Sequence, residues 1–351
     1  MSAISQRHSD TSVHDLQRST FIFVIGFLLF AIAALTMTTT APIGMSVLIV
    51  ILFAGPHNYV EARYFLTRLP RRLGPLKRYF LYSAAGIVIL TVTYPLLAHV
   101  PDFVLRANRS GIGSRRAAFV MVSVGIWNTA LIFWCAGLAA LRSSQRPYRN
   151  WDYKWPIAFG VAGAAWLQPL LLPLLLVFAH PLMGLWLLDR EILFRRPHWS
   201  FAYRLCVATV PVMLIMLWTL LPVGVSDLWP DIHGVERQIA RHVGAPLFSP
   251  VISKRLIASH AFLELLHYGV WIVAIPVASG RVFSKPFQAI PLLRRSGLVR
   301  SIIRIGLIVG LAAVIALWLF FQADYSTTRD VYFAIAMLHV LAEIPFLLRM
   351  L

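Results

Sequence analysis

The chain has 351 residues, of which 59% are hydrophobic and only 13% are charged, with a formal net charge of +18 at pH 7. Apolar stretches of about 20 residues recur along its whole length, which excludes a soluble globular protein. They are longer and more uniformly apolar than the alternating strands of a membrane barrel. The sequence therefore predicts an all-α fold, a polytopic integral membrane bundle of transmembrane helices.

The chain opens with a polar tail, residues 1–19, which we expect in the cytoplasm, followed by a single transmembrane domain over 20–351. No small-residue cleavage site closes the first apolar run, so we expect that run to be retained as the first span. The expected spans are 20–39, 43–67, 79–99, 117–141, 157–188, 201–222, 255–279, 299–321 and 330–349.

Positive charge is concentrated in three loops, 68–78, 142–155 and 281–298. The positive-inside rule places all three in the cytoplasm and makes anionic membrane lipids their partners. No nucleic-acid-binding motif is visible, and we expect no nucleic acid partner. The membrane we expect is a bacterial inner (plasma) membrane.

The three loops share one side only if the stretch 157–188 crosses the membrane an even number of times. Pro169, Pro173 and Pro181 favour a break of this stretch into short or tilted helices, because proline removes a helical hydrogen bond. The sequence thus predicts about 9–10 transmembrane helices. The arginines of loop 100–116 then lie on the opposite side, against the rule.

Three of the five glutamates follow a histidine by four residues inside an apolar stretch, and random placement would give roughly 0.2 such pairs. The pairs are His57/Glu61, His260/Glu264 and His339/Glu343. This spacing puts both side chains on one helix face. A charge in hydrocarbon costs at least ~2.5 kcal/mol, so such residues face the bundle interior and mark function. The alternative is that the pairs only hydrogen-bond and hold helices together.

Intramembrane histidines are the candidate metal ligands: His57, His180, His260, His267 and His339. Their glutamate partners would act as catalytic groups, as ligands, or as acceptors that orient the ligating imidazoles. Imidazole and carboxylate without thiolate suit non-haem iron, and also zinc or manganese. One ion and two ions both remain open. His180 lacks an acid four residues on, so helix packing is its alternative role.

Four further residues are candidates for a pocket that holds a long apolar substrate. Trp127 and Asn128 lie on the fourth span, Gln168 lies near the expected break, and Trp271 lies one turn beyond His267. Core packing is the alternative for the tryptophans, whereas a buried amide needs polar partners in hydrocarbon.

The segment Pro56-His57-Asn58-Tyr59-Val60-Glu61 resembles the P-H-G-x-x-D segment of the Brp/Blh family of membrane β-carotene cleavage dioxygenases. This chain has Glu in place of Asp and Asn in place of Gly. In that family, histidines from several spans hold a non-haem iron that splits carotene to retinal. The resemblance implies that His57 is an iron ligand and that His260 matches the first histidine of the family's H-x3-H motif. The second position of that motif is Glu264 here.

These features predict an integral membrane non-haem metal oxygenase, or a related redox enzyme, with iron as the favoured metal. Its substrate would be a lipophilic small molecule such as a carotenoid, an isoprenoid or another lipid. Two alternatives remain: a non-enzymatic protein that binds haem or handles metal, and a proton-coupled transporter whose His–Glu pairs relay protons.

Overall fold

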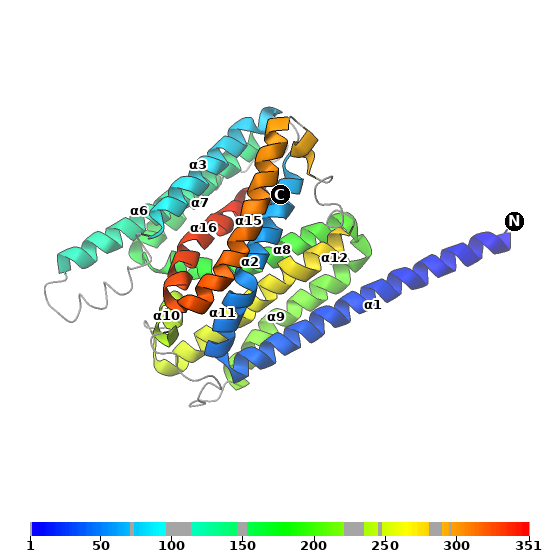
Figure 1. Ribbon diagram of the computed structural model, residues 1–351, viewed down its shortest axis with the longest axis horizontal. Helices are drawn as coiled ribbons and strands as arrows, with labels where there is room; N and C mark the ends of the chain where they lie inside the picture. The colour runs from blue at the N-terminus through cyan, green and yellow to red at the C-terminus, as the bar shows by residue number, and fades with distance from the viewer. Residues whose placement is uncertain are drawn as a thin grey trace. The chain divides into compact units, whose positions relative to one another are not determined.

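The computed structural model describes residues 2–70, 74–95, 114–145, 153–220, 235–244, 248–280, 290–294 and 297–350. Within these ranges the chain is helical and contains no β-strand (Figure 1). The predicted all-α fold is confirmed.

Nine helical segments in the described part of the chain are long and apolar enough to cross a membrane, as expected for an integral membrane protein. A helix satisfies its own backbone hydrogen bonds, which hydrocarbon requires. The long helices are α1 Ser2–Thr40, α2 Pro42–Arg68, α3 Lys77–Thr93, α6 Ser114–Ser143, α8 Leu171–Arg195, α9 Ser200–Leu220, α11 Pro250–Gly269, α15 Gly297–Ala323 and α16 Tyr325–Met350. The shorter elements are η1 Gly74–Leu76, α7 Lys154–Leu167, η2 Pro197–Trp199, α10 Val235–His242, a π-helical turn Val270–Ala274, α12 Ile275–Ser279 and η5 Pro291–Arg294.

The expected stretch 157–188 is divided into two helices, as its prolines indicate. Helix α7 ends at Leu167, and α8 begins at Leu171. Gln168, with φ −141° and ψ 79°, leaves the helical conformation directly before Pro169, because a residue that precedes proline is disfavoured in the α region.

Two other expectations extend past the described residues. The ends of the expected spans 79–99 and 201–222 fall partly in 96–113 and 221–234, which lie outside the described part, as does most of loop 100–116. At the start of the chain, the helix α1 already covers the segment 2–19 that we expected as a polar tail.

The chain divides into two compact units, and we describe each by itself. Unit 1 consists of Met1–His57 and Pro181–Pro286, and unit 2 consists of Asn58–His180 and Phe287–Leu351. The single domain and the cytoplasmic tail stay predictions.

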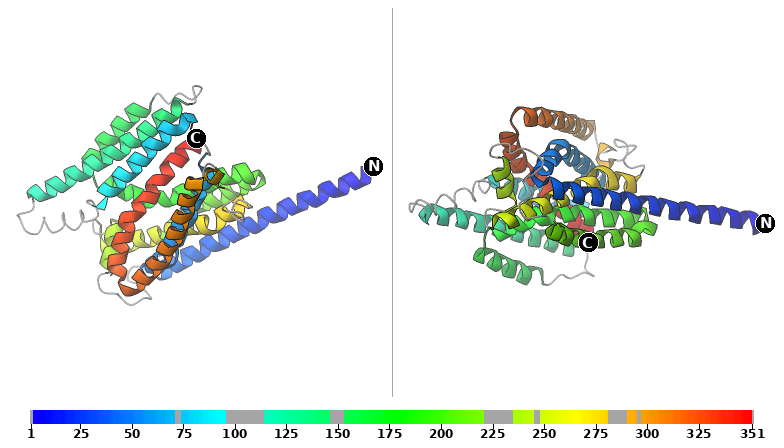
Figure 2. Two further views of the ribbon diagram at one scale, coloured as in Figure 1. Left: turned by 45° about the horizontal axis from the view of Figure 1, so that its top comes forward. Right: turned by 90° about the horizontal axis from the view of Figure 1, so that it is seen from below.

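In unit 1, helix α1 packs against both α9 and α11, and α10 packs against α11 (Figures 1 and 2). The close approach of α1 to α11 depends on Gly269, where a Cβ atom would collide with the ring of Phe30. Near the start of α9, the ring of Trp199 stacks on Phe23 with centroids 4.5 Å apart.

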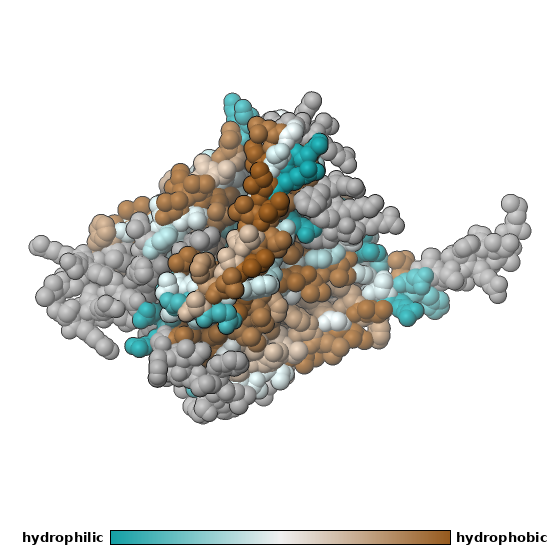
Figure 3. All heavy atoms as spheres, viewed as in Figure 1, coloured by the Kyte–Doolittle hydropathy of each residue, from teal (hydrophilic) through white to brown (hydrophobic). Residues whose placement is uncertain are grey.

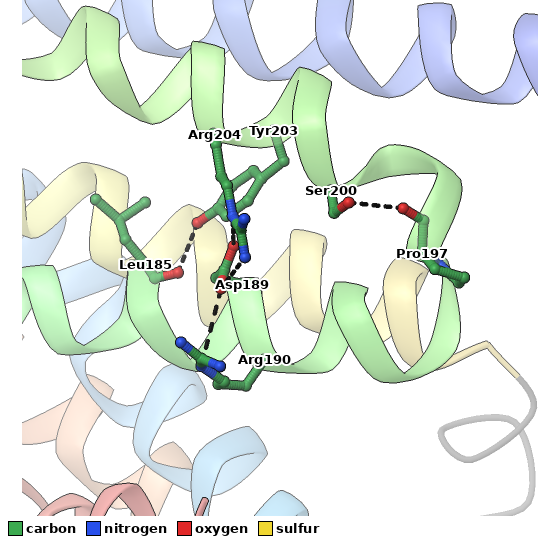
Figure 4. A network of polar contacts seen from close by, with 7 residues as sticks. All are labelled: Leu185, Asp189, Arg190, Pro197, Ser200, Tyr203 and Arg204. Carbon is green, nitrogen blue, oxygen red and sulfur yellow. Dashed lines mark hydrogen bonds and ion pairs between the residues drawn. The ribbon is translucent and has the colours of Figure 1, made fainter. Parts of the chain in front are cut away.

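Unit 1 also holds a polar network at the α8–α9 corner (Figure 4). Asp189 accepts two hydrogen bonds from Arg204, from Nε at 2.9 Å and from a terminal nitrogen at 3.3 Å. Nearby, Tyr203 donates its hydroxyl proton to the carbonyl of Leu185. Bidentate pairing compensates the buried carboxylate at a helix end, where snorkelling arginines are expected.

Unit 2 is organised around α16, which packs against α3, α6 and α15. Trp127 and Trp134 of α6 donate their indole N–H groups to backbone carbonyls of α3, Leu90 at 3.1 Å and Tyr82 at 3.2 Å. Because the contacts run in opposite order along the two helices, α3 and α6 are antiparallel.

The second half of α2 also belongs to unit 2 and lies along α16. Asn58 donates to the hydroxyl of Tyr332 at 3.4 Å, the rings of Phe65 and Phe346 stack at 4.2 Å, and Arg349 donates to a carbonyl near the end of α2 at 2.7 Å. The residue numbers of these contacts increase in the same order along both helices. This part of α2 therefore runs in the same direction as α16.

Helix α15 presents an apolar outer face. Figure 3 shows a continuous brown surface along it, and its mean hydropathy reaches 2.5. Its side chains at Ile305, Ile308 and Leu319 are more than half exposed in the unit. Such a face fits contact with lipid tails, which need no polar partner.

Candidate metal centre

Unit 2 brings together four of the predicted site residues, from three helices. Glu61 lies on α2, His180 lies near the middle of α8, and His339 and Glu343 lie one turn apart on α16. The Nε2 atoms of His180 and His339 are 3.2 Å apart. A ligand atom of Glu61 lies within 4.8 Å of one on His339.

Glu343 is the carboxylate beside His180. Its Oε2 atom lies 3.2 Å from Nδ1 of His180. A proton on Nδ1 would leave the lone pair of Nε2 for a ligand. A ligating histidine in proteins usually has this kind of carboxylate neighbour on its other nitrogen. Glu343 is completely buried, which keeps the carboxylate away from competing water.

Glu61 is the carboxylate that points to a cation. It is 1% exposed, and among the described residues neither of its oxygens accepts a hydrogen bond. It also lies close enough to Glu343 to be repelled by that carboxylate. A buried carboxylate in this position requires a bound cation or a proton to compensate its charge.

The donor set fits a transition-metal ion. Two imidazole nitrogens that bind one tetrahedral ion at 2.0–2.1 Å are about 3.4 Å apart, close to the 3.2 Å between the two Nε2 atoms here. Two imidazoles and a carboxylate are donor types that also hold non-haem iron in oxygenases. Residues of these types could hold a metal ion here, and the identity of that ion stays a prediction.

The parallel contacts between α2 and α16 position this group. Asn58 and Tyr332 meet on one side of it, and Phe65 and Phe346 stack on the other. Glu61 thus lies between two fixed points on its helix. The histidine–glutamate spacing identified Glu61, His339 and Glu343, but it could not show that Glu343 contacts His180 of a different helix.

Unit 1 contains a second pair of predicted ligands. The rings of His57 and His267 have centroids 5.5 Å apart and meet edge to face. Nδ1 of His57 lies 3.1 Å from the carbonyl oxygen of Phe53, and Nδ1 of His267 lies 3.4 Å from that of Pro181. A carbonyl only accepts, so both rings carry the proton on Nδ1 and keep the Nε2 lone pair for a ligand.

Glu264 makes the contact that its spacing predicts and one that the sequence analysis missed. Its Oε2 atom lies 3.6 Å from Nδ1 of His260, and its Oε1 atom accepts a hydrogen bond of 3.0 Å from the hydroxyl of Tyr268. The Tyr268 ring also contacts the His57 ring in a tilted arrangement, with centroids 4.3 Å apart. Tyr268 follows Glu264 by four residues, so the same spacing rule, widened to tyrosine, would have found it.

The four pocket candidates do not all have the same surroundings. Asn128 is fully buried and donates to the carbonyl of Pro169 at 2.7 Å, and Trp127 donates to a carbonyl of α3. Gln168 is exposed at the end of α7, whereas Trp271 is completely buried in unit 1. Their role toward a substrate stays a prediction.

The comparisons with known proteins identify no relative: no protein-family model, no curated protein and no solved structure matches the chain.

Proposed function

We propose that the chain is an integral membrane metalloenzyme in which His180, His339 and Glu61 hold a non-haem iron ion and Glu343 orients His180. The observation that carries the proposal is the combination of two imidazole nitrogens 3.2 Å apart with a buried carboxylate that has no hydrogen-bond donor among the described residues. Zinc and manganese accept the same donors.

The bound ion would supply oxygen activation for the oxidation of a lipophilic substrate, and the protein would supply the ligands and a dry environment. Glu61 would balance the charge of the ion, and Glu343 would hold the proton on Nδ1 of His180. The substrate class, a carotenoid, isoprenoid or other lipid, is proposed because the ligands lie on helices apolar enough to cross a membrane. The Brp/Blh resemblance makes β-carotene the first compound to test, and the bacterial inner membrane is the proposed location.

The test is metal analysis with an absorption spectrum of the full chain, purified anaerobically in detergent. We expect tightly bound iron without the Soret band of haem, and loss of the iron in His180→Ala and His339→Ala. His198→Ala, at a histidine that packs against Trp199 instead, serves as the matched control and should keep the metal. The metal-to-protein ratio distinguishes one ion per chain from two.

Sub-stoichiometric metal in the wild-type chain after reconstitution with iron, zinc and manganese would refute the metal centre. A proton-coupled transporter would then be the better proposal. The contact between His260 and Glu264 is the observation that favours it, because a neutral imidazole next to a carboxylate can accept and pass on a proton.

A further inference from the structure

A row of polar side chains runs along α11 in unit 1 and continues onto α10. Starting from the interior, the hydroxyl of Tyr268 donates to Glu264 at 3.0 Å, and Glu264 lies 3.6 Å from Nδ1 of His260. The ring of His260 then meets the ring of His242, on α10, edge to face with centroids 5.2 Å apart. Each member of the row thus neighbours the next.

The two ends of this row lie in different surroundings. His260, Glu264 and Tyr268 are at most 7% exposed and belong to the stretch Ile252–Ser279, which is long and apolar enough to cross a membrane. His242 is only half-buried and lies on α10, a short helix outside the nine stretches of this kind in the described chain. The row therefore links a polar surface helix to the apolar interior of the unit.

The other titratable groups near the row lie at its two ends. Helices α1 and α9 pack against α11, and the sequences of their segments 20–40 and 207–220 contain no acidic, basic or histidine side chain. At the inner end, the rings of His57 and His267 lie beside Tyr268, with centroids 4.3 Å and 5.9 Å from that of Tyr268. The remaining charged groups lie near the outer end. They are Glu236, Arg237 and Arg241 on α10 and Lys254 and Arg255 on α11.

Histidine is suited to this position because it can take a proton on one nitrogen and release another from the opposite one. At His260, a proton would first bind to Nε2 from the His242 side. The Nδ1–H bond would then break as an O–H bond forms on the Glu264 carboxylate. The ring would be neutral before and after the transfer, and Glu264 would become a neutral carboxylic acid.

We propose that His242, His260 and Glu264 form a proton path from α10 into the interior of unit 1, with Tyr268 as the hydrogen-bond donor that holds Glu264 in place. The path does not depend on the proposed metal centre. It would serve any reaction or transport step in the unit that consumes or releases protons.

The test follows the protonation of Glu264 in the full chain after a rapid change of pH. The infrared carbonyl band of the protonated carboxyl group is the signal, and its absence in Glu264→Gln assigns it. We expect His260→Gln and His242→Gln to slow the change by roughly 100-fold, the lower end of what a positioned acid–base group contributes. Tyr268→Phe should shift the band, because the hydrogen bond is lost.

Controls separate the path from general damage and from the metal proposal. His198→Gln, which changes a histidine at the α8–α9 corner, should leave the rate unchanged. The measurement is repeated after chelator treatment, so a chain without metal can still show the path. Unchanged rates in both His260→Gln and His242→Gln, or a Glu264 band that does not respond to pH in the wild-type chain, would overturn the proposal.

Discussion

Glu61 combines deep burial with the lack of a hydrogen-bond donor among the described residues, which makes its charge costly without a cation. We predict opposite effects of Glu61→Gln on the metal-free and the metal-loaded chain. Without metal, the variant should be more stable by on the order of 1–3 kcal/mol, the cost of an unsatisfied buried group. With metal, affinity should fall by at least about 100-fold, the upper end of the loss seen for groups that only orient a ligand.

Thermal unfolding in detergent, with and without chelator, measures the first effect, and metal titration measures the second. Glu236→Gln, on the surface helix α10, makes the same chemical change outside the membrane-crossing stretches and should alter neither. A metal-free Glu61→Gln chain that is less stable than wild type would mean that a donor or a proton already compensates this carboxylate.

Gly184 allows α8 to approach His267. A Cβ atom at this position would lie 2.8 Å from Nδ1 of His267 and 3.5 Å from Nε1 of Trp271. We predict that Gly184→Ala displaces the imidazole from the carbonyl of Pro181 and lowers stability by about 1–3 kcal/mol, the usual cost of overpacking.

The control for this variant is Gly163→Ala on α7, where a Cβ atom meets nothing within 4 Å. Alanine is preferred to glycine in a helix by roughly 0.5–1 kcal/mol, so this control should be neutral or stabilising. Thermal unfolding compares the two variants. Equal changes in stability in the two variants would show that the His267 ring can move aside at little cost and is not held in place by α8.

Part of the candidate site could be predicted from the sequence because helical spacing is a property of one chain segment. It identified His260 and Glu264 as neighbours, and they are in contact. It could not find the contact of His180 with Glu343, since the two residues lie on helices α8 and α16. Contacts between helices depend on packing angles and rotations that spacing along one helix does not contain.

At the scale of the helices, the break between α7 and α8 depends on Asn128. Its amide donates to the carbonyl of Pro169 at 2.7 Å, and a buried carbonyl without a donor costs about 1–3 kcal/mol. We predict that Asn128→Ala destabilises the chain by this amount, as measured by thermal unfolding. Ser123→Ala, at a half-buried serine whose hydroxyl donates to a carbonyl of the same helix, should have little effect, and so a similar loss in both variants would contradict the role of Asn128.

The break was predictable because proline restricts both itself and the residue before it, and its position at Gln168 and Pro169 agrees with that rule. The exact ends of the two helices were not predictable from composition, since apolar residues continue on both sides. Asn128 was selected only as a buried amide in need of a partner, and the sequence did not show that its partner would be the backbone at the break.

For the whole molecule, the direction of α16 determines how many times the chain crosses the membrane. It runs parallel to the second half of α2 within unit 2, as the contacts of Phe65 with Phe346 and of Asn58 with Tyr332 show. A chain reverses direction at each crossing, so an even number of crossings must follow α2. This condition is met only if the short helix α7 also crosses.

We therefore predict ten crossings, with the positive loops 68–78, 142–155 and 281–298 on one side. In a chain without Cys135 and Cys206, Lys77→Cys and Ser144→Cys should react with a membrane-impermeant thiol reagent from the same side. Ser326→Cys, in the first turn of α16, should react from the other side. Labelling of Ser326→Cys and Ser144→Cys from one side would require an odd count and would leave α7 at the membrane surface.

The π-helical turn Val270–Ala274 has a consequence for any comparison of this chain with relatives. There the N–H of Ile275 bonds five residues back, to Val270, so the turn contains one residue more than an α-helix would need. Deleting that residue would rotate everything after it by about 100°, which would turn Ser279 away from Glu191, to which it donates at 2.9 Å. In a relative that lacks the extra residue, the helix can keep either the direction of the His267 side chain or the contact of Ser279 with Glu191, but not both.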